Sequence, residues 1–158
     1  MTSPGPPAFE PKDENYVERM RQTFEAQSAM AALGVQIEEV KPGFIAFSLL
    51  DNPSFRQQHG FLHGGAVATV LDSACGFAAF TLMPADAEVL TVEFKVNFLA
   101  PAKGETFRIE GLVIKPGRTI TLAEGRAYAT ENGQQKLIAT MTATLMTITG
   151  RNDVKQTG

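Results

Sequence analysis

Apolar residues recur along the chain at two periods, one typical of helices and one typical of strands. Between residues 13 and 33 they recur every three to four positions, which predicts a helix. Asp13 or Asn15 can cap its start, and Gly34 can end it. This first helix should pack its apolar side on something larger.

Two β-prone runs follow, at 35–40 and 44–50, and the Lys-Pro-Gly sequence between them predicts a hairpin. A loop at 51–60 leads to a segment at 63–82 that is apolar on nearly every side. A helix on the surface would carry a polar face. The segment therefore predicts a helix that is covered on several sides.

Long alternating segments occupy the rest of the chain and predict an antiparallel meander. They span 89–99, 106–115, 119–130 and 136–147. The order of helix, hairpin, apolar helix and meander predicts an α+β fold. We expect a curved antiparallel sheet wrapped around a long central helix, with an extra helix at the N-terminus.

Polar and apolar residues alternate in the first segment of this meander. The polar positions are Thr91, Glu93, Lys95 and Asn97, and the apolar positions are Val92, Phe94, Val96 and Phe98. Alternate side chains of a strand point to opposite faces of the sheet. We therefore predict an apolar face and a polar face, the latter bordering a site or another subunit.

Length and composition fit one globular domain, which we assign to 13–149, with flexible tails at 1–12 and 150–158. The net charge of -3 argues against a nucleic-acid partner, which would need a basic surface. Polar residues interrupt the apolar stretch 66–83, and no signal-peptide pattern precedes it, so we expect no membrane partner. Cys75 is the only cysteine, which excludes an internal disulfide and favours a cytoplasmic location.

Asp72 is the most informative single residue, because it interrupts the apolar helix. An ionised carboxylate among apolar side chains costs several kcal/mol unless a partner or a function compensates. Asp72 is thus a candidate general base or nucleophile. The alternative is a structural role, in which it faces solvent or caps a neighbouring loop.

His63, Gly64 and Gly65 stand where this helix is expected to begin. Unpaired backbone N–H groups and the positive end of the helix dipole meet at such a point, and glycine allows a ligand to approach closely. These residues could therefore form an oxyanion pocket. In the alternative, His63 is only a capping residue and the glycines only ease a tight turn.

Nine residues separate His63 from Asp72, which is about two and a half helical turns, about 180° around the axis and ~13 Å along it. The two cannot meet within one helix. A site that uses both must therefore lie between two copies of the chain, related by a two-fold axis.

Other polar residues near these positions carry weaker signals. Gln57, Gln58, His59 and Thr91 could orient a water molecule or a carbonyl group. The two histidines lack acidic or thiol neighbours at ligand spacing, and the chain has no phosphate-binding or dinucleotide motif, so we expect neither a metal nor a cofactor. Arg118 could hold phosphates or could be a solvated charge in a turn.

The segment 57–72, with its His-Gly-Gly and an Asp nine positions after the His, resembles the hotdog-fold acyl-CoA thioesterases of the phenylacetate-degradation (PaaI-like) type. The strand that starts at Thr91 and the Pro-Gly-Arg turn at 116–118 resemble them too. The resemblance covers residues 33–146. It implies a homodimer, often paired into a dimer of dimers, with active sites at the dimer interface.

The resemblance also implies roles for individual residues. Asp72 would be the base or nucleophile, the Gly64 amide would bind the thioester oxygen, and Thr91 would steady the water. Arg118 would lie near the phosphates of coenzyme A. Independently of the resemblance, Gly65 would let the substrate come close, because glycine has no side chain.

The family usually has Asn six positions before the motif His, whereas this chain has Gln57. Either Gln57 or His59 could therefore orient the water. An apolar slot for the acyl group could draw on aromatic and leucine side chains of the loop and helix. The candidates are Phe61, Leu62, Phe77 and Phe80, and the alternative is that these side chains belong to the core.

Two other functions remain open from the sequence. One is a hotdog hydratase or dehydratase acting on an acyl-CoA or acyl-carrier substrate, which would need Asp72 and His63 close together. The other is a non-catalytic acyl-CoA-binding module in which Asp72 is structural.

Overall fold

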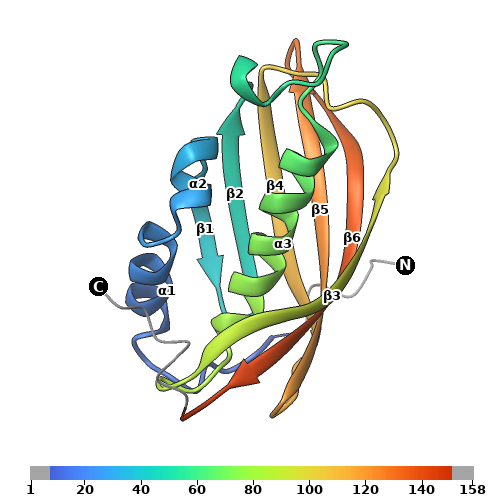
Figure 1. Cartoon of the computed structure of the whole chain (residues 1–158). Helices are drawn as coiled ribbons and strands as arrows, with labels where there is room; N and C mark the ends of the chain where they lie inside the picture. Colours follow the sequence, from blue (N-terminus) through green and yellow to red (C-terminus); the bar gives the residue numbers. More distant parts are fainter. Residues whose placement is uncertain (1–7, 151–158) are drawn as a thin grey trace.

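In the computed structural model, which describes residues 8–150, one antiparallel sheet curves around a central helix (Figure 1). The strand order is β1-β2-β4-β5-β6-β3. The strands are β1 (Gln36–Lys41), β2 (Phe44–Leu50), β3 (Glu88–Phe98), β4 (Thr106–Lys115), β5 (Ile120–Glu131) and β6 (Gln134–Ile148). The helices are α1 (Tyr16–Glu25), α2 (Ser28–Leu33) and α3 (Gly64–Phe80), with a short 3-10 helix at Pro53–Phe55. The predicted α+β architecture is confirmed, but β3 pairs with β6 rather than with β4, so the predicted meander of four consecutive strands holds only for β4, β5 and β6.

Helix α3 lies directly on the middle of the sheet, and most of its residues from Ala66 to Phe80 are buried. A Cβ atom on Gly111 of β4 would overlap the backbone carbonyl oxygen of Ala74. The absence of a side chain at Gly111 thus lets the helix backbone touch the strand. This close packing explains why the segment is apolar on nearly every side.

The single N-terminal helix that the sequence predicts is instead two helices, α1 and α2, with a break at Ala26–Gln27. In one continuous helix, Met30 would point about 80° away from Met20, because each residue advances the chain by about 100°. The break lets both methionines reach the core, where they are 0% and 1% exposed. Tertiary packing therefore overrides the continuous helical pattern.

Arg19 of α1 fastens this N-terminal segment to the end of α3. Its guanidinium donates hydrogen bonds to the carbonyl oxygens of Phe80 (3.2 Å), Met83 (2.9 Å) and Pro84, and it lies 4.4 Å from the centre of the Phe80 ring. Asp13 forms an ion pair with it at 3.2 Å. Burial lowers the pKa of Arg19, and the Asp13 carboxylate opposes this shift. The cation thus stabilises the negative end of the α3 dipole.

Strand β3 is an edge of the sheet and departs from the predicted alternation. Its register against β6 shifts at Val92, so Thr91 faces Leu145 and Glu93 faces Thr144. This bulge puts Thr91 on the helix side of the sheet, on the same face as Phe94 and Phe98, rather than with Glu93. The prediction that Thr91 shares a face with Glu93, Lys95 and Asn97 is therefore wrong.

The ends of the predicted domain are only partly covered by the structure. Phe9 packs against the core, although it falls in the predicted tail 1–12. Residues 1–7 and 151–158, which make up most of the two predicted tails, lie outside the described residues. Among residues 8–150, no helix is both long enough and apolar enough to cross a bilayer.

Candidate active site

The start of α3 leaves one backbone amide free. His63 is the N-cap, and its Nδ1 accepts a hydrogen bond from the Gly65 N–H at 2.8 Å. Its carbonyl oxygen accepts from Ala66 (2.9 Å) and Val67 (3.2 Å). Among residues 8–150, no acceptor bonds the N–H of Gly64. That amide, at the positive end of the α3 dipole, is available to an oxyanion.

The side chain of His63 therefore has a capping role in this chain. Because Nδ1 accepts the Gly65 hydrogen bond, the ring proton of neutral His63 lies on Nε2. The sequence left capping open as the alternative to a functional role. The structure shows that the capping contact and a free neighbouring amide occur together.

Phe98 of β3 covers Gly64, and sequence reasoning did not single it out for the site. A Cβ atom on Gly64 would lie 3.1–3.6 Å from three atoms of the Phe98 ring. Both residues line a groove of about 490 Å³ between the start of α3 and the end of β3, which we call the strand groove. Its walls also include Gln57, Phe61 and Leu62. The only sequence signal for Phe98 was its place on the apolar side of a strand.

Asp72 is half-buried on α3 and is held by the neighbouring strand. The Thr91 hydroxyl donates a hydrogen bond of 2.8 Å to Asp72 Oδ1. The other carboxylate oxygen, Oδ2, has no hydrogen-bond donor in the part of the chain that the structure describes. The carboxylate is thus fixed in orientation by Thr91 and keeps one oxygen free to take a proton or attack a carbon.

Gly64 and Asp72 do not meet within one chain. Since α3 begins at Gly64, with His63 outside it, eight residues separate them, which is about 80° around the axis and ~12 Å along it. The angle of about 180° predicted for His63 assumed that His63 belongs to the helix, whereas it is the N-cap and has an extended backbone. The axial distance still keeps the amide and the carboxylate of one chain apart.

The other predicted site residues fall into two groups. Gln57 and Phe61 lie in the loop before α3, where the Gln57 N–H donates to the Phe61 carbonyl at 2.8 Å. The Gln57 side-chain oxygen accepts from the N–H of His59, which is itself exposed. Phe77 and Phe80, candidates for an acyl slot, are buried in the core at 2% and 1% exposure.

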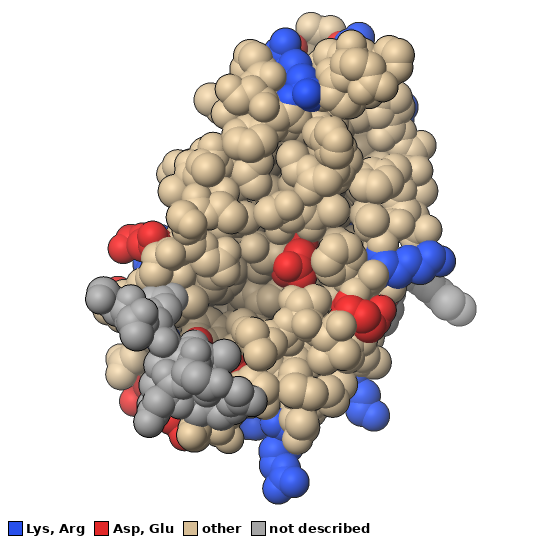
Figure 2. Space-filling model, viewed as in Figure 1, with Lys and Arg blue, Asp and Glu red and all other residues tan. Residues whose placement is uncertain are grey.

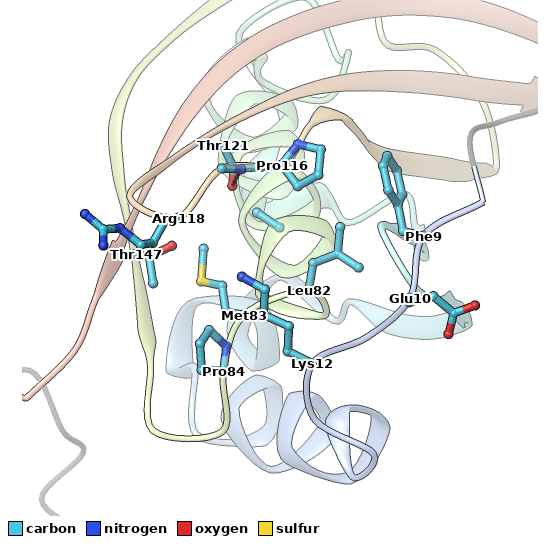
Figure 3. A pocket seen from close by; sticks show the side chains of 12 residues that line it. Phe9, Glu10, Lys12, Leu82, Met83, Pro84, Pro116, Arg118, Thr121 and Thr147 are labelled. Carbon is cyan, nitrogen blue, oxygen red and sulfur yellow. Dashed lines mark hydrogen bonds between the residues drawn. The ribbon is translucent and has the colours of Figure 1, made fainter.

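Arg118 lies far from the helix start, at the opposite end of α3. It borders a cavity of about 250 Å³ whose walls include Ala79 and Leu82, just where α3 ends. Figure 3 shows its guanidinium extending away from the other labelled side chains. No carboxylate of residues 8–150 forms an ion pair with it. One chain thus does not bring Arg118 and Gly64 together.

Comparison with known proteins identifies the family. The profile of the thioesterase superfamily matches residues 59–136. A crystal structure of a thioesterase family protein from Silicibacter pomeroyi is 53% identical, with a TM-score of 0.85, covering 85% of this chain and 99% of that one. The chain belongs to the thioesterase superfamily. The predicted thioester hydrolase with a hotdog fold is confirmed at this level.

Two more distant similarities agree with this family. The medium/long-chain acyl-CoA thioesterase YigI of Escherichia coli is 25% identical over 130 residues, which are 73% of this chain and 82% of YigI. The Escherichia coli PaaI protein, from the phenylacetic acid degradation operon, is 19% identical with a TM-score of 0.78, covering 88% of this thioesterase and 97% of PaaI. At that identity the PaaI likeness shows the fold alone.

Proposed function

We propose that this thioesterase hydrolyses acyl-CoA thioesters, with Asp72 of one subunit and the Gly64 amide of another acting on the same substrate. The observation that carries the proposal is the Asp72 carboxylate, held by Thr91 with Oδ2 free. A carboxylate held on an apolar helix with one unbonded oxygen is arranged for proton transfer or attack. The free Gly64 N–H supplies the complementary donor.

The reaction follows from these two groups. The Gly64 N–H and the α3 dipole bind the thioester oxygen and stabilise the negative charge that grows on it. In one route, Asp72 takes a proton from a water molecule whose oxygen attacks the carbonyl carbon, and the C–S bond then breaks. In the other route, an Asp72 oxygen attacks the carbonyl carbon, the C–S bond breaks to leave a mixed anhydride, and water hydrolyses the anhydride. In both routes the coenzyme A thiolate leaves and takes up a proton.

Two copies are needed because the amide and the carboxylate of one chain are ~12 Å apart along α3. Strand β3 supplies a surface for this pairing, since it is an edge strand with exposed apolar side chains. Val92 and Phe98 are 53% and 54% exposed. Figure 2 shows that the face carrying α3 and β3 is largely uncharged, with few acidic side chains near its middle. An exposed apolar edge of this length favours antiparallel addition of a second β3.

Further residues would complete the bound substrate. Arg118 is exposed and without an ion-pair partner among residues 8–150, so it can hold a coenzyme A phosphate in the dimer. Gln57 borders the strand groove beside Gly64, and its side-chain NH₂ can bind a water or a carbonyl. His59 is the other candidate for orienting the water, since it is exposed and its backbone N–H donates to the Gln57 side-chain oxygen.

A direct test measures thiol release from short-chain, long-chain and aryl acyl-CoAs by the wild type and by Asp72→Asn. We expect turnover of at least one class, and a loss of kcat of about 10³-fold or more in the variant, because the proton acceptor is gone. Acyl-CoA binding should persist. The control Glu25→Gln removes the same charge from an exposed site on α1 and should keep full activity.

Two results would contradict the proposal. Wild-type protein that binds acyl-CoA without releasing thiol would favour the binding module. Full activity in Asp72→Asn would show that the carboxylate takes no part in hydrolysis.

A further inference from the structure

A second groove opens on the other side of the α3 start, and α2 forms one of its walls. This helix groove has a volume of about 420 Å³, within the range of small-molecule sites. Its lining includes Ala29, Ala32 and Leu33 of α2 and Phe55 of the 3-10 helix that precedes α3. Gly65 and Thr69 of α3 border it as well, so it reaches the residue next to the free Gly64 amide.

Several of the polar groups around the helix groove are bonded within the protein, whereas the Ser54 hydroxyl and His63 Nε2 have no hydrogen-bond partner among residues 8–150. The Thr69 hydroxyl donates to the Gly65 carbonyl oxygen at 2.8 Å, and His63 Nδ1 accepts from the Gly65 N–H. Arg56 is paired with Asp51. A polar ligand would therefore find few free partners, whereas the methyl and phenyl surface of the walls suits an apolar one.

Helix α2 is a fixed wall, because its Met30 and Leu33 are buried in the core at 1% and 6% exposure, and residues just before it contact α3. The Ser73 hydroxyl donates to the Gln27 side-chain oxygen at 3.2 Å. The Phe24 ring lies 5.9 Å from that of Phe77. Ala29 and Ala32 stand one turn apart on this helix and both line the groove, so a larger side chain at either position would reduce the volume of the groove.

We infer that the acyl chain of the substrate lies in the helix groove and that Ala29 and Ala32 set the chain length the enzyme accepts. This inference rests on the proposed acyl-CoA hydrolysis. A thioester held at Gly64 has two arms, and a groove leads away from each side of that residue. The strand groove is also lined mostly by apolar side chains, but it lies at the β3 edge, where the proposed second subunit would pair, so the coenzyme A arm can leave along it between the subunits. The helix groove includes no β3 residue and lies within one subunit, so we assign the acyl arm to it.

Enlarging α2 tests the assignment. In Ala32→Leu and Ala29→Leu we expect kcat/KM for decanoyl-CoA to fall at least tenfold, while kcat/KM for acetyl-CoA stays within twofold of the wild type. Each methylene that loses its place costs about fourfold, which corresponds to about 0.8 kcal/mol. The retained acetyl-CoA turnover also shows that each variant has folded and dimerised.

Ala31→Leu is the matched control, since Ala31 is exposed on the same helix and does not line the groove. It should leave both substrates unaffected. Equal loss for acetyl-CoA and decanoyl-CoA, or no loss for either, would overturn the acyl-chain assignment while the proposed hydrolysis stands. A wild-type enzyme that hydrolyses no acyl-CoA would instead overturn the proposed function, and the inference with it.

Discussion

The hydrogen bond from Thr91 to Asp72 gives a sharp prediction for the variant Thr91→Val. Valine keeps the shape and the strand preference of threonine but removes the donor that lies 2.8 Å from Asp72 Oδ1. A hydrogen bond to a carboxylate contributes about 1–2 kcal/mol at a partly exposed site, so kcat should fall about 5- to 30-fold. KM should stay nearly constant, because Thr91 positions the carboxylate rather than binding the acyl-CoA.

The assay is steady-state thiol release with the acyl-CoA that the wild type turns over best. Thr91→Ser keeps the donor and should recover most of kcat. Thr144→Val is the matched control, because Thr144 donates to Glu93 on the outer face of the sheet, one strand away. Wild-type kcat in Thr91→Val, or an equal loss in Thr144→Val, would refute the positioning role.

Three further predictions concern stability, reactivity and assembly. Arg19→Met should lower the free energy of unfolding by about 2–4 kcal/mol in urea titrations, because three hydrogen bonds to carbonyl oxygens and the contact with the Phe80 ring are lost. The control Arg21→Met, at an exposed position of the same helix, should change it by less than about 0.5 kcal/mol. Burial raises the pKa of Cys75 to about 12, so the thiol stays protonated at pH 8. A disulfide reagent should therefore label Cys75 only after unfolding, and rapid labelling of the folded protein would contradict this. Phe94→Lys on β3 should convert dimers to inactive monomers in sedimentation velocity, and an active, dimeric variant would exclude pairing through this edge.

Much of the fold could be predicted from the sequence because its signals are local. The long apolar helix, the hairpin and the alternating strands each follow from one period of hydrophobicity. The break between α1 and α2 could not be predicted, because it arises from the directions in which Met20 and Met30 reach the core. The bulge at Val92 depends on pairing with β6, a strand far along the chain.

In the candidate site too, local features could be predicted from the sequence, whereas contacts between distant segments could not. Asp72 and the His-Gly-Gly start were visible, since a carboxylate in an apolar helix and paired glycines at a helix start are unusual. The contact of Phe98 with Gly64 and the hydrogen bond of Thr91 to Asp72 were not, because both depend on how β3 curves against α3. The grooves on either side of the helix start likewise need three segments to be placed together.

The central claim, a site shared between two subunits, is tested most directly by mixing two inactive variants. Asp72→Asn lacks the carboxylate, and Gly64→Pro lacks the amide hydrogen while keeping a residue that the first position of a helix accepts. After unfolding and refolding together in equal amounts, half of the dimers are mixed, and each mixed dimer holds one intact site of two. The account predicts about a quarter of the wild-type activity from the mixture, whereas activity no higher than that of the two separate variants would contradict it.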